Sequence, residues 1–187
     1  MNELLEFLQQ KTEIQSSDLE NICFNFKELR LNKNDHFLRQ GQRSNHYVFI
    51  KSGGLRIYLE NEDKQVTVWL AFESCFFAEL SSLKNNTPSR FNIQAFENCQ
   101  LYIIPFEKME QLYIQYPGWQ KFVREIWEEA YVNVMEGIIA HQLLTAEERY
   151  LLCLQQPEIM QRVPLKYVAS FLGITTSSLS RLRNNIR

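Results

Sequence analysis

The stretch that decides the fold is Val163-Pro-Leu-Lys-Tyr-Val-Ala-Ser-Phe-Leu-Gly-Ile-Thr-Thr-Ser-Ser-Leu-Ser-Arg-Leu-Arg-Asn-Asn-Ile-Arg187, at the end of the chain. Leu165, Val168 and Leu172 recur in it at helical spacing, which predicts an amphipathic helix. Gly173 follows where this helix would stop, because glycine tolerates the left-handed conformation of a tight exit. The spacing therefore predicts a short helix that ends at Gly173.

A second helix is predicted directly after this turn. Thr175 or Thr176 has the side chain of a helix N-cap. Leu179, Leu182 and Ile186 then recur at three and four residues, so one face of the helix packs and the other is free. Two short helices joined by a glycine turn are typical of a helix-turn-helix, whose second helix enters the major groove of DNA.

The free face of the second helix is polar. Its side chains donate or accept hydrogen bonds, so they suit base edges and phosphates. The alternative is a pair of ordinary amphipathic helices at the end of a fold, since short helices broken by glycine are common. The residues on the free face are Thr176, Ser177, Ser180, Arg181 and Asn184, with Arg183 beside them.

Charge is unevenly distributed along the chain. The 187 residues include 20 Lys and Arg and 22 Asp and Glu, for a net charge of −2. Five of the basic residues and none of the acidic ones lie from Gln161 onward, which leaves 15 basic and 22 acidic residues in the rest. Attraction for phosphate is therefore concentrated at one end. The five basic residues are Arg162, Lys166, Arg181, Arg183 and Arg187.

Length and composition suit one large and one small domain with a real core. Hydrophobic residues make up 45% of the chain and aromatic residues 13%. No apolar run approaches the ~20 residues that a membrane helix needs. The amino terminus lacks the basic region and the cleavage site of a signal peptide. We therefore expect a cytoplasmic protein.

The cysteines form no recognisable metal or catalytic motif. Cys23, Cys75, Cys99 and Cys153 are far apart without a C-x-x-C pair, which predicts free, buried or half-buried thiols. No metal site is predicted, although ligands that meet only in three dimensions are an alternative. The sequence contains no P-loop, glycine-rich nucleotide fingerprint or Ser-His-Asp order, so catalysis is not predicted.

The central part of the chain has the pattern of a β domain. Short apolar or alternating segments are separated by turn residues about every eight to twelve positions, as in a sandwich or barrel. Two short helices are predicted before them, the second capped by Ser17. The predicted strands span residues 26–31, 46–51, 55–59, 65–71, 91–96 and 99–104.

The longest helical pattern follows the strands. Pro105 ends the last strand and a helix is predicted from Phe106. After Pro117 a second helix is predicted from Trp119 to about Leu144. Its apolar stripe is wider than a small β domain would cover, so we expect a homodimer in which two copies of this helix pack. The alternative is a helix that lies on its own domain only. The stripe contains Trp119, Phe122, Val123, Ile126, Trp127, Ala130, Val134, Ile138 and Ile139.

This order of elements resembles the CRP/FNR superfamily of bacterial transcription factors, named for the cyclic-AMP receptor protein and the fumarate-nitrate regulator. The resemblance covers nearly the whole chain. It is most specific at Gly41 before residues 47–53, at Phe76-Phe-Ala-Glu-Leu80, and from Ala169 to Arg183. The run from residue 164 to residue 175 is similar to the subgroup common in Bacteroidetes-type bacteria.

The resemblance implies an α+β fold in three parts. A cyclic-nucleotide-binding-like sensor domain, a β-roll of the double-stranded β-helix or jelly-roll type, would take residues 1–116. A dimerisation helix would take 117–144 and an all-α helix-turn-helix domain 145–187. Thr145 and Glu148 have the spacing of a capping box, which predicts a helix at the start of this third part. The family continues into a β-hairpin wing, whereas the sequence stops at Arg187, so a helix-turn-helix without a wing is expected.

The resemblance also implies an effector site in the β-roll. Nucleotide-binding members carry Gly-Glu-Leu, with the Glu on the ribose, and a later Arg-Ser pair on the cyclic phosphate. The Gly-Glu-Leu motif corresponds here to Ala78, Glu79 and Leu80. The Arg-Ser pair corresponds to Ser89 and Arg90, in which the order of the two residues is reversed. A slip of one residue turns a side chain to the opposite face of a strand, so cyclic AMP is not the expected effector. The alternatives are a loop insertion that returns Arg90 to the phosphate, a different ligand, or none.

In the same family the recognition helix often carries Arg-Glu-Thr-Val-x-Arg, whose Arg and Glu contact bases. The matching residues run from Thr176 to Arg181, so Thr176 and Ser177 replace the long charged side chains. Arg181 is kept and suits guanine O6 and N7. Lys166 and Arg183 are expected to contact phosphates.

The sequence thus predicts a dimeric transcription regulator, not an enzyme, that binds a palindromic operator in double-stranded DNA. An effector in the β-roll, either a cyclic nucleotide or another small molecule, would control it, and no other cofactor is predicted. RNA polymerase would be a further partner of an activator. The alternative is a signalling module that binds a small molecule and whose helix-turn-helix is vestigial.

Overall fold

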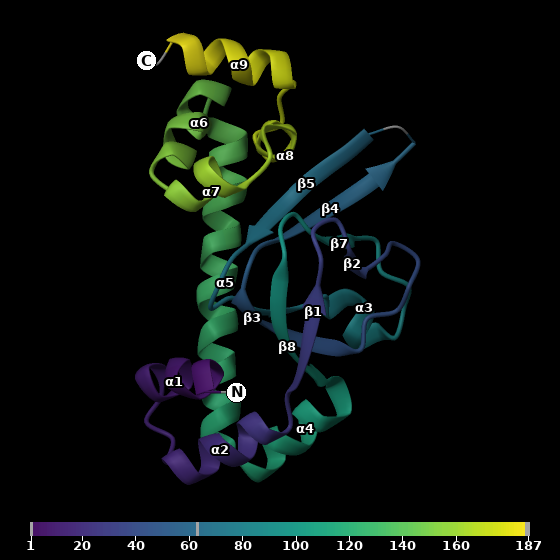
Figure 1. Cartoon of the computed structure of the whole chain (residues 1–187), viewed down its shortest axis with the longest axis vertical. Coiled ribbons are helices and arrows are strands. Elements are labelled where there is room, and N and C mark those ends of the chain that lie inside the picture. Colours follow the sequence, from purple (N-terminus) through teal and green to yellow (C-terminus); the bar gives the residue numbers. More distant parts are fainter. Residues whose placement is uncertain (1, 63, 186–187) are drawn as a thin grey trace.

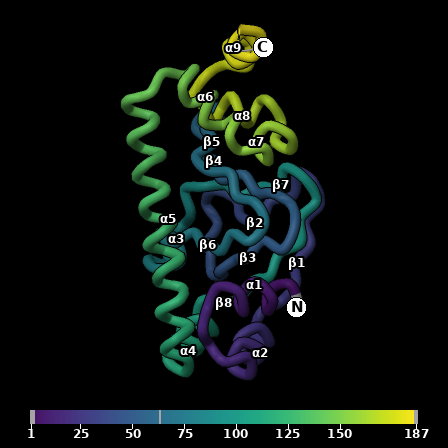
Figure 2. The backbone as a smooth tube through the Cα atoms, turned by 90° about the vertical axis from the view of Figure 1, so that its left-hand side faces the viewer, coloured from purple at the N-terminus to yellow at the C-terminus, as the bar shows by residue number. Residues whose placement is uncertain are grey.

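The computed structural model describes residues 2–62 and 64–185. One helix, α5 (Pro117–Leu143), follows the long axis of an elongated molecule, as Figure 1 shows. A β-roll lies beside it, amino-terminal helices pack at one end, and short carboxy-terminal helices form the other end (Figures 1 and 2). The predicted order of elements is confirmed.

Two four-stranded antiparallel sheets form the β-roll, with the strand orders β1-β8-β3-β6 and β2-β7-β4-β5. Successive side chains of a strand point to opposite faces, so Val48 and Ile50 of β3 enter the core between the sheets, whereas Tyr47 and Phe49 pack on the other side. The core between them takes Ile50 and Leu101 from the first sheet and Leu55 from the second, all fully buried. The strands are β1 (Lys27–Leu31), β2 (His36–Leu38), β3 (His46–Ser52), β4 (Leu55–Asn61), β5 (Lys64–Ala71), β6 (Phe76–Ala78), β7 (Asn92–Ala95) and β8 (Cys99–Pro105).

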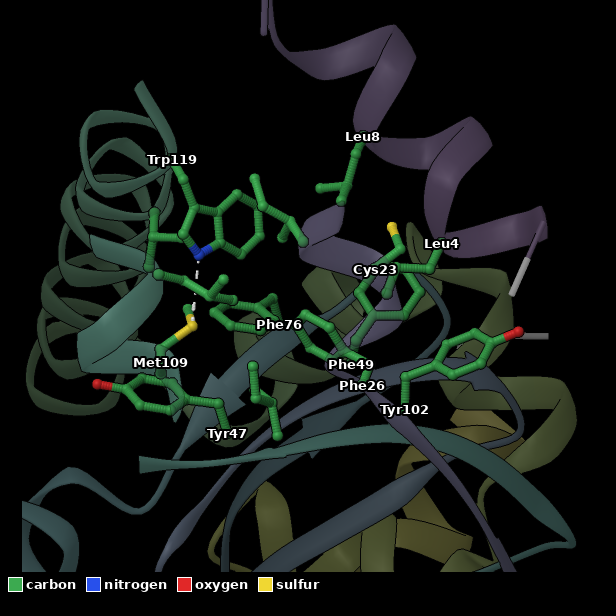
Figure 3. Packing of buried hydrophobic residues seen from close by; sticks show 14 of the residues in the cluster. Leu4, Leu8, Cys23, Phe26, Tyr47, Phe49, Phe76, Tyr102, Met109 and Trp119 are labelled. Atoms are coloured by element: carbon green, nitrogen blue, oxygen red, sulfur yellow. Dashed lines mark hydrogen bonds between the residues drawn. The ribbon is translucent and has the colours of Figure 1, made fainter. Parts of the chain in front are cut away.

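Helices and aromatic side chains cover the other side of the first sheet. Trp119, near the start of α5, is 1% exposed, and its indole N–H donates to Met109 Sδ at 3.4 Å (Figure 3). Its ring meets Phe76 of β6 at 6.3 Å and Phe122 at 5.6 Å between ring centroids, distances typical of favourable aromatic pairs. The first turns of α5 are therefore fixed to the β-roll. The other covering helices are α1 (Asn2–Lys11), α2 (Ser16–Phe24) and α4 (Phe106–Gln115).

The second half of α5 presents apolar side chains to solvent. Val134 keeps 60% of its surface exposed and Ile138 keeps 45%. The predicted stripe thus divides into a buried first half, which includes Phe122 and Val123, and an exposed second half. The predicted helix itself is confirmed. It begins at Pro117 rather than Trp119, because proline is favoured in the first turn of a helix.

The carboxy-terminal helices share an apolar cluster with the β-roll. Val168 and Leu179 are almost fully buried in it, together with Leu70 of β5 and Phe96 beyond β7. These helices therefore pack on the second sheet as well as following α5 in the chain. They are α6 (Ala146–Leu154), α7 (Pro157–Arg162), α8 (Leu165–Phe171) and α9 (Thr176–Asn185).

The capping box predicted at Thr145 is present, whereas the cap predicted at Ser17 is not. The capping box is confirmed, because Glu148 N donates to Thr145 Oγ1 at 3.2 Å and Thr145 N donates to Glu148 Oε2 at 2.7 Å. The cap at Ser17 is wrong: α2 begins at Ser16, and Gln15 occupies the N-cap position without a side-chain hydrogen bond.

Several short elements, among them β2, β6 and α7, are not predicted from the sequence. The strands β2 and β6 have three residues each, too few to show an alternation. The helix α7 has six residues and begins at Pro157. The predicted helix residue Ile186 and the basic residue Arg187 lie outside the described residues. Among the helices that the structure describes, none is both long enough and apolar enough to span a membrane.

Candidate functional site

The helix-turn-helix consists of α8, a turn at Gly173, and α9. Gly173 has a φ of +71°, the left-handed conformation predicted for this helix exit. Thr175 caps α9, because its Oγ1 accepts a hydrogen bond from Ser178 N at 3.1 Å. Leu179, at 1% exposure, fixes α9 against the other helices. Of the two predicted caps, Thr175 is the correct one.

The polar face of α9 is open to solvent. Figures 1 and 2 show α9 lying across one end of the molecule, beyond the other helices. Arg181 Nη2 lies 3.5 Å from Ser178 Oγ, a weak contact that leaves the guanidinium free to bind elsewhere. The structure thus brings the predicted base contacts together on one helix. Thr176, Ser177, Ser180 and Arg181 are exposed on α9, Arg183 is half-buried there, and Lys166 is exposed on α8.

Arg162 is not available to DNA, although the sequence counts it in the basic segment. Its guanidinium donates to the two carboxylate oxygens of Glu73 at 2.7 and 2.8 Å and to Glu97 at 3.1 Å. These hydrogen bonds lower the pKa of Glu73 to about 2. The positive charge open to phosphate is therefore smaller than the sequence predicts. Within the described residues, it comes from Lys166, Arg181 and Arg183.

Glu79 has a structural role at the proposed ribose position. It is the N-cap of α3 (Leu80–Asn85), and its Oε2 accepts from Ser82 N at 2.9 Å. Only 8% of its surface is exposed, and a carboxylate is stabilised at a helix start by the amide groups and the dipole there. Ala78 and Leu80 are half-buried on either side. Helix capping therefore accounts for Glu79 without a ligand.

Ser89 and Arg90 differ sharply in exposure. Ser89 is 3% exposed; its Oγ accepts from Phe91 N at 3.0 Å and donates to Phe91 O at 3.2 Å. Its backbone N–H also donates to Gln42 O at 2.7 Å. Arg90 is exposed. The hydroxyl therefore lies inside and the guanidinium at the surface, although neither residue belongs to a strand, since β7 begins at Asn92.

The four cysteines are free thiols, as predicted. Three are buried and Cys75 is half-buried. Burial raises the pKa of the Cys75 thiol to about 12 and that of Cys23 to about 11, which keeps both neutral and poorly reactive. Over residues 2–62 and 64–185, no three His, Cys, Asp or Glu side chains gather as a metal ion would require.

The contact of Arg56 between the β-roll and the helix-turn-helix is absent from the sequence predictions. Arg56 of β4 is 1% exposed and lies between the rings of Tyr58 and Tyr167, 4.0 Å from each centroid. Tyr167 belongs to α8. Strand alternation indicates only that Arg56 faces away from the inner core. The local sequence holds no signal for a partner in a distant helix.

The sequence of the β-roll matches a known family. Residues 28–116 match the model of the cyclic nucleotide-binding domain. A search of curated proteins found no match. The β-roll is therefore a domain of the cyclic nucleotide-binding type.

Solved structures match almost the whole chain. A variant of CooA from Carboxydothermus hydrogenoformans is 22% identical with a TM-score of 0.71, covering 97% of this chain and 83% of that chain. The c-di-GMP responsive global regulator CLP from Xanthomonas campestris is 14% identical with a TM-score of 0.75, covering 92% and 91%. A regulator assigned to the CRP/FNR family from Eubacterium rectale is 17% identical with a TM-score of 0.72, covering 95% and 85%.

These likenesses define the architecture as a cyclic nucleotide-binding domain joined by a long helix to carboxy-terminal helices. The fold is that of the CRP/FNR-type transcription regulators, as the sequence resemblance implied. The narrower Bacteroidetes-type subgroup stays a prediction, as does the absence of a wing.

Proposed function

We propose that this chain is a transcription regulator that binds a palindromic operator in double-stranded DNA. The main support is the position of α9, a capped helix at one end of the molecule. Its exposed face holds Thr176, Ser177, Ser180 and Arg181. A helix so placed enters a major groove without displacing the rest of the fold. The fold shared with CRP/FNR-type regulators supports the same function.

The contacts with DNA divide by chemistry. Arg181 would bind guanine O6 and N7, the commonest specific contact of arginine, and the smaller hydroxyl residues would meet neighbouring base edges. Lys166 on α8 and Arg183 on α9 would bind phosphates, which fix the position of the helix on the duplex. Specificity would thus depend on one long side chain.

The operator is palindromic because the protein acts as a homodimer through the second half of α5. The same helix face packs on itself in a twofold interface. A twofold axis parallel to α5 brings both α9 helices to the same end of the dimer, where one duplex meets both half-sites about 34–36 Å apart. In this arrangement residues 1–116 form the sensor, 117–144 the dimerisation helix and 145–187 the DNA-binding part. The apolar residues available for the contact are Tyr131, Val134, Met135, Ile138 and Ile139.

The effector of the β-roll is a small molecule other than cyclic AMP. Glu79 already caps α3, Ser89 is bonded to backbone, and Arg90 is exposed. Loss of a guanidinium that grips a phosphate removes about 1.5–3 kcal/mol, or roughly tenfold to a hundredfold in affinity. Calorimetry with cyclic AMP tests this. Tight binding that Arg90→Ala abolishes would show that the arginine does reach the phosphate.

The DNA-binding function is tested by selection from a pool of random duplexes at low salt. We expect enrichment of a palindrome, and loss of that enrichment in Arg181→Ala. The matched control is Arg124→Ala, since Arg124 is exposed on α5 and its Nε lies 3.4 Å from Glu128 Oε1. If no sequence is enriched by the wild-type protein, the proposed function fails, and the signalling module with a vestigial helix-turn-helix takes its place.

A further inference from the structure

We propose that the β4–β5 hairpin is a second link, beside α5, between the β-roll and the helix-turn-helix, and that Arg56 of this hairpin fixes the orientation of α8 and hence of α9. The proposal has three independent supports: a buried cation, a hydroxyl bound to a strand edge, and a chain of contacts back to the β-roll interior. Its consequence for DNA rests on the proposed function above, whereas the link itself does not.

The first support is the environment of Arg56. The guanidinium donates from Nε to Thr67 Oγ1 at 2.8 Å and from Nη1 to Gln65 Oε1 at 3.0 Å. Across the described ranges no carboxylate lies within ion-pair distance of it. The nearest carboxylate named by these contacts, Glu60, accepts from Gln65 Nε2 at 2.8 Å and so reaches the guanidinium only through that amide, and a buried cation without a direct counter-charge is costly. Here the faces of Tyr58 and Tyr167 offset that cost, because arginine stacks favourably on aromatic rings.

This environment exists only in one arrangement of the two parts. Tyr58 and Thr67 belong to the hairpin, but Tyr167, at 6% exposure, comes from α8. If α8 moved on the hairpin, the guanidinium would lose the ring of Tyr167 and keep only the partners on its own hairpin. Such an arrangement would offset less of the cost of removing the charge from water. Arg56 therefore disfavours other orientations of the helix-turn-helix.

The second support is Ser170, one turn after Tyr167 on α8. Its Oγ accepts from Thr67 N at 2.9 Å and donates to Gln65 O at 2.9 Å. Since β5 is the edge strand of the second sheet, these two backbone groups have no neighbouring strand to bind. The hydroxyl takes the place of a strand partner and holds α8 in register with the hairpin.

The third support is a line of contacts from the hairpin to the candidate effector segment. The ring of Trp69 on β5 meets the ring of Phe77 on β6 edge-on, with 5.6 Å between centroids. Phe77 precedes Glu79, the cap of α3, by two residues. A ligand that moves β6 or α3 would therefore act on one side of the hairpin, while α8 is bound to the other side.

The link is tested first without DNA, by hydrogen exchange on the full-length protein. We expect Ser170→Ala and Arg56→Gln to speed exchange of the backbone amides in residues 64–71 and 165–172 at least tenfold. Exchange in β8 should stay unchanged, which shows that the variants fold. The control Arg30→Gln, at an exposed arginine of β1 in the other sheet, should change neither segment. Unchanged exchange in both test variants would overturn the proposal.

The second readout is affinity for the operator recovered by selection. We expect Arg56→Gln and Tyr167→Leu each to weaken binding at least tenfold. The double variant should be no weaker than the poorer single variant, because both substitutions remove the same contact. The orienting role would be refuted if the fold-losses in affinity of the two single variants multiplied in the double variant. It would also be refuted if the single variants bound the operator as tightly as the wild type, or more tightly. A wild-type protein that binds no DNA would refute the proposed function, while the exchange measurement would still decide whether the link exists.

Discussion

A negative charge on the second half of α5 is predicted to separate the dimer. Val134 keeps 60% of its surface exposed in the single chain. Full burial of such a side chain is worth about 1.5–3 kcal/mol, so covering this fraction contributes about 1–2 kcal/mol in each protomer. A twofold interface contains the residue twice. Val134→Glu therefore removes about 2–4 kcal/mol and also places two carboxylates in an apolar contact, which is costly.

Sedimentation equilibrium measures the effect directly. Since 1.4 kcal/mol corresponds to a factor of ten, the dissociation constant of the dimer should rise by at least about 30-fold. The matched control is Ile114→Glu, because Ile114 is an exposed aliphatic residue on α4, with 84% of its surface accessible. If Val134→Glu forms a dimer as tight as the wild type, α5 is not the dimer contact.

Two further predictions concern stability. Trp119→Ala should lower the free energy of unfolding by about 3–5 kcal/mol in denaturant titration, because the side chain is 1% exposed. The control is Trp69→Ala, at a site that is 39% exposed. If Trp119→Ala costs no more stability than this control, the packing described for Trp119 is wrong. Arg162 holds the pKa of Glu73 at about 2, below its ordinary value of 4.5, so the stabilisation is fully present above pH 4.5 and is lost as the pH falls through 2. Glu73→Gln should therefore flatten the fall in melting temperature over this interval, and curves of equal slope for the two proteins would refute the ion pair's role.

The parts of the fold that depend on local spacing could be predicted from the sequence. The turn at Gly173, the cap at Thr175 and the box from Thr145 to Glu148 each involve residues a few positions apart, so their chemistry is visible in the sequence. The long helix was also predictable, because its apolar stripe persists from Trp119 to Ile139.

The contacts that depend on distant partners could not be predicted. Arg162 has the appearance of a phosphate ligand until the fold brings Glu73 and Glu97 to it. Arg56 alternates in its strand like a surface residue, yet α8 buries it. A sequence pattern indicates which face a side chain takes, but the partner on that face is set by tertiary packing.

The candidate effector segment, from Ala78 to Arg90, shows a related limit. The spacing between Glu79 and Arg90 predicted a disturbed phosphate site, and the structure adds that Glu79 caps α3 and Ser89 binds backbone. Each of these roles is made by a hydrogen bond within a few residues. The sequence could have indicated the cap, because an acidic residue directly before a short helix is a common N-cap.

The central claim is that α9 recognises DNA sequence through Arg181. Fluorescence anisotropy with the selected palindrome and with a duplex changed at one guanine measures the ratio of the two affinities at a fixed salt concentration. We expect the wild type to prefer the palindrome by about 1–3 kcal/mol at that base pair, and Arg181→Ala to bind both duplexes equally. An Arg181→Ala protein that keeps the full wild-type preference would contradict the claim.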